Sequence, residues 1–350
     1  MKGKFAACFL AGLAATTAGA IPAGAADAPK PVYFIFTGYA YPYFAPMAEA
    51  VKQAATHHPD MAVKIVNANN SPSDEIADLN EAVAAGAKGI ILNTIQESVT
   101  GTAAKAMKAG IPIVTVDRDV ADPSARVAFI GDNDVTLGKE ETQFAVDTLE
   151  KNKVKKPWHV VILQGTLGAS VSIGRLNGAM EVLQPLVDKK EVEISLNQSA
   201  DFATDKAQAM ISTELAKTTD IQLVVCGNDA MALGVIKALQ THKIAPGRQT
   251  LVVGADAQPE SLQAVKEGTQ LDTVTHSPFV EAYWAVEAMA NILQDGTKPP
   301  ASKFPDGNVI IPMTVVTQAN VDKISAWGTP EEIAPLPYGK AQAYRVTSDK

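Results

Sequence analysis

Polar side chains recur directly after short apolar runs of this sequence, and their types suit the binding of hydroxyl groups. A carboxylate, an amide or a guanidinium donates or accepts hydrogen bonds in a fixed planar geometry. A sugar hydroxyl both donates and accepts, so pairs of such groups can satisfy it. The residues that follow the apolar runs are Thr37, Asn93, Asp117, Arg118, Asp132, Asn133, Gln164, Asn228, Asp229, Asp256 and His276.

Aromatic residues follow the first of these runs. Tyr39, Tyr41, Tyr43 and Phe44 lie within one short loop. Aromatic rings can cover the apolar C–H faces of a pyranose or furanose, so this loop and the polar set together predict a carbohydrate site. Each feature taken alone has a structural alternative. Asn228 could simply cap the next helix, and the tyrosines could pack against the start of the helix that follows them.

An alternation of strands and helices must position these residues. Short apolar runs fit strands that are covered on both faces, and amphipathic stretches lie between most of them. In open α/β sheets, ligands bind outside the carboxyl ends of the strands, where these polar residues gather. The expected helices include 45–55, 73–84 with a cap at Ser73, 204–215, 230–239 and 279–293. The expected strands are 32–36, 62–66, 89–92, 113–116, 126–130, 159–163, 191–196, 223–226, 251–254 and 272–275.

The number of strands favours two sheets over one. We therefore predict an α/β protein with two doubly wound parallel-sheet (Rossmann-like) domains joined by a multi-crossing hinge. The hinge crossings are expected near residues 131–132, 276–277 and 304–305, and one further strand is expected at 309–316. The predicted boundaries are 26–131 plus 277–304 for the N-terminal lobe, 132–276 plus 305–330 for the C-terminal lobe, and 331–350 for a C-terminal tail.

The composition and the motifs exclude several classes of function. Of the 350 residues, 47% are hydrophobic and 19% are charged, which is typical of a globular protein. A net charge of −8 offers no basic field to a nucleic acid. No nucleotide-binding, nucleophile-elbow or H-E-x-x-H motif occurs, so we expect no cofactor, no metal and no catalytic residue. An acid pair of Asp117 and Asp256 is the enzyme alternative.

The first 25 residues are predicted to be a signal peptide. Lys2 and Lys4 form a basic head, residues 5–21 are apolar and uncharged, and residues 23–25 are small enough for a cut before Ala26. The alternative interpretation is a membrane anchor. The signal peptide predicts export to the periplasm.

Two stretches carry most of a family resemblance. They are Gly110-Ile-Pro-Ile-Val-Thr-Val-Asp117-Arg118 and Asn228-Asp-Ala-Met-Ala-Leu-Gly234, and further matches lie in order between residues 32 and 293. On these motifs the chain resembles the ribose-binding-protein family of periplasmic binding proteins, the sugar-binding components of ABC importers. The resemblance implies the type I periplasmic binding protein fold, binding without catalysis, a sugar or polyol as ligand and an ABC permease of the inner membrane as partner.

The resemblance also implies ligand contacts, residue by residue. Tyr43 and Phe44 match paired aromatic positions of the first lobe and Phe202 matches one of the second, so their rings would sandwich the sugar. Arg175 matches a polar contact of the second lobe. With the residues at the strand ends, the predicted ligand-binding set is Thr37, Tyr41, Tyr43, Phe44, Asn93, Asp117, Arg118, Arg175, Phe202, Asn228, Asp256 and His276.

Three positions depart from the ribose binders. Tyr41 replaces an asparagine, His276 replaces a glutamine, and Ala255 replaces an aromatic residue. These departures weaken ribose as the ligand and suggest another sugar, a polyol or a substituted saccharide.

A cleft between two lobes predicts a mechanism that needs no chemical step. A ligand that contacts both lobes stabilises the closed state, and a change from 1% to 99% closed needs about 5.5 kcal/mol. A few charge-assisted hydrogen bonds can supply that free energy. We expect a monomer. The alternative function is a periplasmic signal receptor, for a furanosyl autoinducer or for a sugar presented to a membrane sensor kinase.

Overall fold

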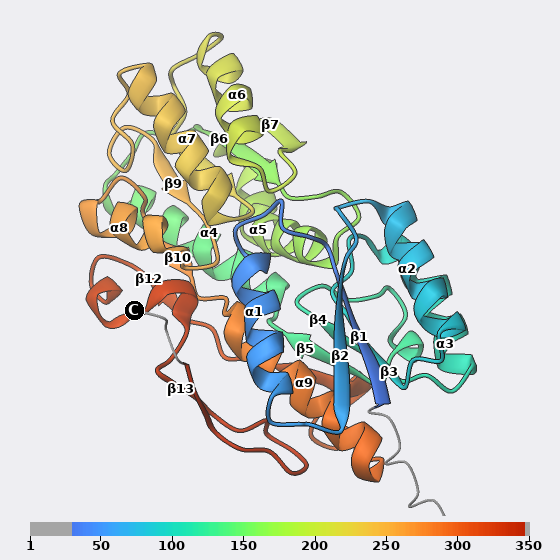
Figure 1. The fold of residues 1–350 in the computed structure, drawn as a ribbon. Helices are drawn as coiled ribbons and strands as arrows, with labels where there is room; N and C mark the ends of the chain where they lie inside the picture. The colour runs from blue at the N-terminus through green and yellow to red at the C-terminus, as the bar shows by residue number, and fades with distance from the viewer. Residues whose placement is uncertain (1–29, 347–350) are drawn as a thin grey trace, which may run out of the picture.

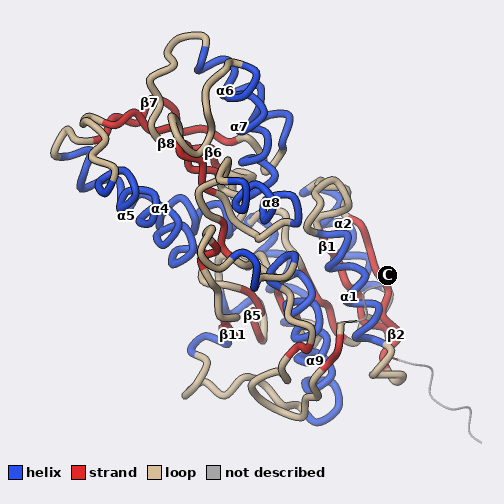
Figure 2. The backbone as a smooth tube through the Cα atoms, turned by 90° about the vertical axis from the view of Figure 1, so that its left-hand side faces the viewer, coloured by secondary structure: helices blue, strands red, loops and turns tan. Residues whose placement is uncertain are grey.

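The computed structural model describes residues 30–346 and consists of two α/β lobes (Figures 1 and 2). Each lobe has its own sheet of parallel strands with helices on both faces, so the predicted fold class is confirmed. The predicted signal peptide and residues 347–350 lie outside the described residues. Within residues 30–346, no helix combines the length and the apolar character that a membrane span requires.

The first lobe is built around a six-stranded sheet with the order β11-β5-β4-β3-β1-β2. Side chains alternate between its faces: Phe34 and Phe36 point into the cluster that contains α1 and α9, whereas Tyr33 and Ile35 point toward α2 and α3. The strands are β1 Lys30–Phe36, β2 Met61–Asn67, β3 Gly89–Leu92, β4 Ile113–Val116, β5 Ala128–Gly131 and β11 Asn308–Ile310. The helices are α1 Phe44–Ala55, α2 Pro72–Ala84, α3 Thr100–Lys108 and α9 Pro278–Asp295.

The second lobe has a four-stranded sheet with the order β7-β6-β8-β9. One face packs on α4 and α5 through a cluster around Trp158 and Val160, and the other face packs on α6 and α7 around Val161 and Leu163. The strands are β6 Trp158–Gln164, β7 Val192–Ser199, β8 Leu223–Cys226 and β9 Leu251–Val253. The helices are α4 Asp134–Lys151, α5 Ser170–Asp188, α6 Thr204–Leu215, α7 Asp229–Thr241 and α8 Pro259–Glu267.

The chain crosses between the lobes where β5 leads into α4, where β10 (Thr273–Val274) leads into α9, and where β11 leads into β12 (Val315–Val316). The strand expected at 309–316 is thus two strands, because Pro312 between them has no N–H to donate to a ladder. β11 pairs with β5 of the first sheet, so the assignment of residues 305–330 to the C-terminal lobe is wrong for residues 308–310. The third crossing follows β11 instead of lying at 304–305.

The C-terminal segment returns to the first lobe after touching the second. Gln318 Nε2 donates to Lys266 O at the end of α8, and Trp284 Nε1 on α9 donates to Ala334 O. Residues 325–330 therefore form a further connection between the lobes, and we call them the strap. The short elements outside the two main sheets are β13 Glu332–Ile333, β14 Tyr344–Arg345, and the 3₁₀ helices η1 Glu97–Val99, η2 Pro123–Ala125, η3 Pro305–Gly307, η4 Val321–Lys323 and η5 Ala326–Gly328.

One expected helix start is shifted. The cap of α2 is Ser71 rather than Ser73, and its Oγ accepts a 3.3 Å hydrogen bond from Asp74 N. Pro72 then occupies the first helical position, where the missing N–H costs nothing.

Candidate functional site

Ten of the twelve predicted binding residues line one cavity between the lobes. The empty space among its lining side chains, counted out to the solvent at its mouth, is about 300 Å³, of which about 30 Å³ can hold the centre of a water molecule. The lining side chains are buried even where they are charged: Asp117 is 4% exposed and Asp256 is 5% exposed. The lining residues are Tyr41, Tyr43, Phe44, Asp117, Arg118, Val171, Arg175, Phe202, Asn228, Asp256 and His276. Thr37 and Asn93 belong to the predicted set but are not among them.

Thr37 and Asn93 lie behind Asp117 and hold it in place. The Asn93 Oδ1 accepts from Thr37 Oγ1 at 2.8 Å, and the Asn93 Nδ2 donates to Asp117 Oδ2 at 2.7 Å. These residues follow β1, β3 and β4, which are neighbours in the sheet, so their side chains meet at its carboxyl edge. Burial raises the pKa of Asp117, and His276 and Arg118 oppose that effect.

Arg118 lies between aromatic rings of the two lobes. Its guanidinium carbon is 5.2 Å from the Phe44 ring centroid and 5.4 Å from the Phe202 ring centroid, within the range of cation–π contacts. Its Nε is buried without a hydrogen-bond partner among the described residues. It lies 3.7 Å from Asp117 Oδ2, an ion pair that is too long for a hydrogen bond, so its N–H can still donate to an acceptor that enters the cavity. The expected sandwich of a sugar between these rings stays a prediction.

Arg175 is the centre of the polar network of the second lobe. Its Nε donates to Asp134 Oδ1 at 3.0 Å, and its Nη1 donates to Gly227 O at 2.7 Å and to Asp256 Oδ1 at 3.1 Å. Its Nη2 lies 2.8 Å from His276 Nδ1. Since its donors are directed at protein groups, Arg175 orients Asp256 and His276 in this arrangement.

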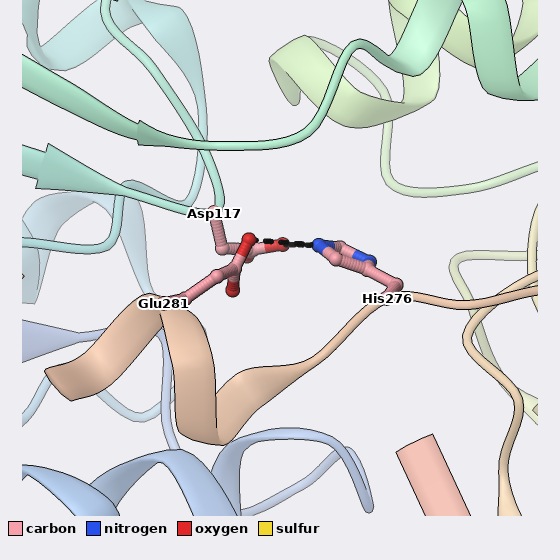
Figure 3. Close-up of side chains that lie close together, drawn as sticks. All are labelled: Asp117, His276 and Glu281. Atoms are coloured by element: carbon pink, nitrogen blue, oxygen red, sulfur yellow. Dashed lines mark hydrogen bonds and ion pairs between the residues drawn. The ribbon is translucent and has the colours of Figure 1, made fainter. Parts of the chain in front are cut away.

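His276 links the network of the second lobe to acids of the first. Figure 3 shows its ring facing Asp117 and Glu281. Its Nε2 lies 2.9 Å from Glu281 Oε1 on the first turn of α9 and 3.4 Å from Asp117 Oδ1. Burial lowers the pKa of His276, but the carboxylates of Glu281, Asp132 and Asp256 outweigh burial and raise it well above its usual value. Its Nδ1 lies 2.8 Å from Arg175 Nη2, which can only donate, and 3.2 Å from Asp256 Oδ1, which accepts. A neutral ring accepts from Arg175 at Nδ1 and a charged ring donates to Asp256 there, and in both forms Nε2–H donates toward Glu281.

Glu281 was not predicted from the sequence, and its carboxyl group contacts both Tyr43 and His276 in this cluster. It is fully buried, its Oε2 accepts a 2.8 Å hydrogen bond from Tyr43 Oη, and burial raises its pKa to about 8. Asp117, His276 and Glu281 bring one ligating atom each to within 4.8 Å of one another, which is compatible in spacing with a metal ion. The Nε2–H of His276 is directed at the carboxylates of Glu281 and Asp117, so a hydrogen-bonded network explains the arrangement without a metal ion.

Phe202 enters the cavity from a strained loop. Asp201 and Phe202 both have positive φ, 57° and 54°, in the left-handed region that non-glycine residues rarely adopt. Thr166 Oγ1 donates to Asp201 Oδ1 at 2.6 Å, and Gly165 leaves the space that the Phe202 ring fills, since a Cβ at Gly165 would collide with that ring. The placement of the Phe202 ring thus needs both the space at Gly165 and the left-handed backbone at Asp201 and Phe202.

Asn228 caps a helix, as the structural alternative expected, and its contact with a ligand stays a prediction. Its Oδ1 accepts from Met231 N at 3.0 Å and so caps α7, and the residue also lines the cavity. Ala255, by contrast, packs with Leu137 and Val274 and is not a lining residue. Val171, at the start of α5, is a lining residue that the sequence did not indicate, because an apolar residue in a helix carries no chemical signal.

The described conformation is closed. Hydrogen bonds join the rims of the lobes: Gln96 Nε2 donates to Leu167 O at 2.9 Å, and Asp119 N donates to Ser170 Oγ at 2.8 Å. A backbone bond from Glu97 N to Gly168 O adds a third link at 2.8 Å. These bonds span two lobes that are connected through the crossing segments, so rotation about those segments would break them and open the cavity.

The comparisons with known proteins agree with this architecture. A family model described as a periplasmic binding protein domain matches residues 32–298. The chain belongs to the periplasmic binding protein family. The ribose import binding protein RbsB of Escherichia coli (strain K12) is 31% identical over 242 residues, which cover 69% of this chain and 77% of that protein. The galactofuranose-binding protein YtfQ of the same organism is 28% identical over 273 residues, which cover 76% and 81%.

A solved structure shows the same fold. The myo-inositol binding protein of Caulobacter superposes with a TM-score of 0.74 at 24% identity and covers 87% of this chain and 98% of that one. Membership in this family confirms the type I fold and the interpretation as a solute-binding protein rather than an enzyme.

Proposed function

We propose that this protein is exported to the periplasm, captures a monosaccharide or related polyol between its lobes, and delivers it as a monomer to an ABC importer of the inner membrane. The observation that carries the proposal is one cavity between the lobes to which both lobes contribute acids, arginines and aromatic rings. Asp117 and Asp256 can accept from hydroxyls, Arg118 can donate to them, and the rings can cover C–H faces. The curated relatives named above, for ribose import and for galactofuranose binding, support a sugar.

A permease can distinguish the liganded protein from the empty one because the ligand favours the closed conformation. Ligand hydrogen bonds to both lobes add to the rim contacts and shift the population toward the closed form. At roughly 1.5–3 kcal/mol for each charge-assisted bond, two to four bonds reach the 5.5 kcal/mol or so that a nearly complete shift requires. No bond in the ligand has to break.

A thermal-shift screen tests the proposal. The panel contains pentoses, hexoses in furanose-accessible and pyranose-locked forms, deoxy sugars and inositols, each at a concentration far above the expected Kd. A ligand at one hundred times its Kd stabilises the folded state by about 2.7 kcal/mol, which is a clear shift in Tm. Stabilisation by one member, lost in Asp117→Asn, supports the proposal. A panel in which no sugar or polyol shifts the Tm contradicts it.

A further inference from the structure

The strap, residues 325–330, carries a tryptophan that contacts both lobes beside the cavity. Trp327 is 9% exposed and has a φ of 59°, in the left-handed region that bulky residues rarely adopt. Neighbouring contacts must therefore hold it there. The strap starts from a segment anchored on α8 and ends where Thr329 Oγ1 and Ser277 Oγ, the cap of α9, form a 2.9 Å hydrogen bond.

On the side of the first lobe, the Trp327 ring supports a wall of the cavity. It packs edge-on against the Tyr43 ring, with centroids 5.5 Å apart and an interplanar angle of 80°. Tyr43 lines the cavity, lies 4.7 Å from the His276 ring and donates its hydroxyl hydrogen to Glu281. A shift of the Trp327 ring would therefore remove one of the contacts that hold the Tyr43 ring in the cavity wall.

On the side of the second lobe, the Trp327 backbone holds the peptide next to an acid of the cavity. The Trp327 N–H donates to Ala257 O at 2.6 Å, and the Ala257 N–H donates to Thr273 Oγ1 at 3.0 Å. Asp256 and Ala257 have positive φ values of 107° and 52°. This unfavourable backbone directs Asp256 into the cavity, and the two hydrogen bonds hold it in that conformation.

We propose that Trp327 is a positioning residue of the cleft, fixing Tyr43 of the first lobe and Asp256 of the second at once. The inference deepens the proposed function, since it takes the cleft as the sugar site. Grooves border the strap on both sides, one against Pro46 and Phe279 and the other against Val280 and Ile311, so the strap has room to move when the lobes rotate. The surroundings of the Trp327 ring then change when the lobes rotate, so its fluorescence indicates whether the lobes are closed.

The first test needs no ligand. Hydrogen exchange of full-length Trp327→Ala should be several-fold faster than in wild type at residues 43–47 and 255–258. Trp327→Phe, which keeps a ring against Tyr43, should restore protection, and Trp158→Phe, the same exchange at the start of β6 in the second lobe, serves as the control away from the strap. Unchanged exchange at both segments in Trp327→Ala overturns the proposal.

The second test uses the sugar that stabilises the wild-type protein most in the thermal-shift panel. Losing an aromatic edge contact should weaken its binding to Trp327→Ala roughly threefold to tenfold in calorimetry, with recovery in Trp327→Phe. The ligand-induced change in tryptophan emission should persist in Trp158→Phe and disappear in Trp327→Phe. Wild-type affinity in Trp327→Ala overturns the positioning role. If no sugar binds the wild-type protein, the proposed function fails, and the exchange experiment still decides the role of Trp327.

Discussion

Glu75→Gln is expected to flatten the dependence of the free energy of unfolding on pH. Glu75 lies on α2 and is 1% exposed, and its Oε1 accepts a 3.1 Å hydrogen bond from Ile95 N. Burial raises the pKa of Glu75 from 4.5 to about 8. Because the folded protein holds this proton more tightly than the unfolded chain, the carboxyl stabilises the fold fully below about pH 4.5. That stabilisation is lost as the pH rises through about 8.

The size of the effect follows from that difference in pKa. A proton bound by the folded but not the unfolded state changes the free energy of unfolding by about 1.4 kcal/mol per pH unit. Between about pH 5 and about pH 8, Glu75 alone therefore accounts for at most roughly 4 kcal/mol. Glutamine does not titrate and has nearly the shape of the protonated acid, so Glu75→Gln removes this contribution while it keeps the packing.

Denaturant unfolding at a series of pH values measures the prediction. The wild-type free energy of unfolding should fall by about 1–4 kcal/mol more than that of Glu75→Gln over this range. Glu81→Gln is the matched control on the same helix, because its side chain is 65% exposed and pairs with Lys64 at the surface. The control should keep the wild-type slope. Parallel curves for the wild type and Glu75→Gln would refute the reasoning.

Three further substitutions test the site. Asp256→Asn should weaken binding of the best sugar at least about tenfold in calorimetry and should also lower the Tm of the free protein, because it removes the charge that pairs with buried Arg175 at 3.1 Å; unchanged affinity would remove Asp256 from the site. Asn93→Ala removes the 2.7 Å bond to Asp117 and should weaken binding roughly twofold to tenfold although Asn93 is not a lining residue of the cavity between the lobes; an unaffected Kd would show that Asp117 needs no support. Gly165→Ala pushes the Phe202 ring out of place and should abolish detectable binding in the same assay, while wild-type binding would contradict the placement of that ring.

The sequence predicted much of the cavity lining because parallel sheets place their carboxyl ends together. Asn93, Asp117 and Asp256 each follow an apolar run, and that position alone indicates a common edge. Two doubly wound lobes also followed from the spacing of strands and helices. Arg175 and Phe202 were predicted only from the family resemblance, because neither residue directly follows a predicted strand.

The remaining parts depend on long-range contacts that no local pattern encodes. Glu281 lies in the first turn of a helix, where an acid is ordinary, and only the crossing before α9 brings it under His276. Trp327 lies in a proline-rich segment without periodicity. The pairing of β11 with β5 was missed because Pro312 divides an apolar run that otherwise indicates one strand.

The central claim, that the lobes close on one polyhydroxylated ligand without altering it, is tested most directly by a crystal structure with the sugar that raises Tm most. We expect one intact sugar in the cavity, with hydroxyls within hydrogen-bond distance of Asp117 from the first lobe and Asp256 from the second. A ligand bound outside the cavity, held by one lobe alone or recovered as a different compound would contradict it.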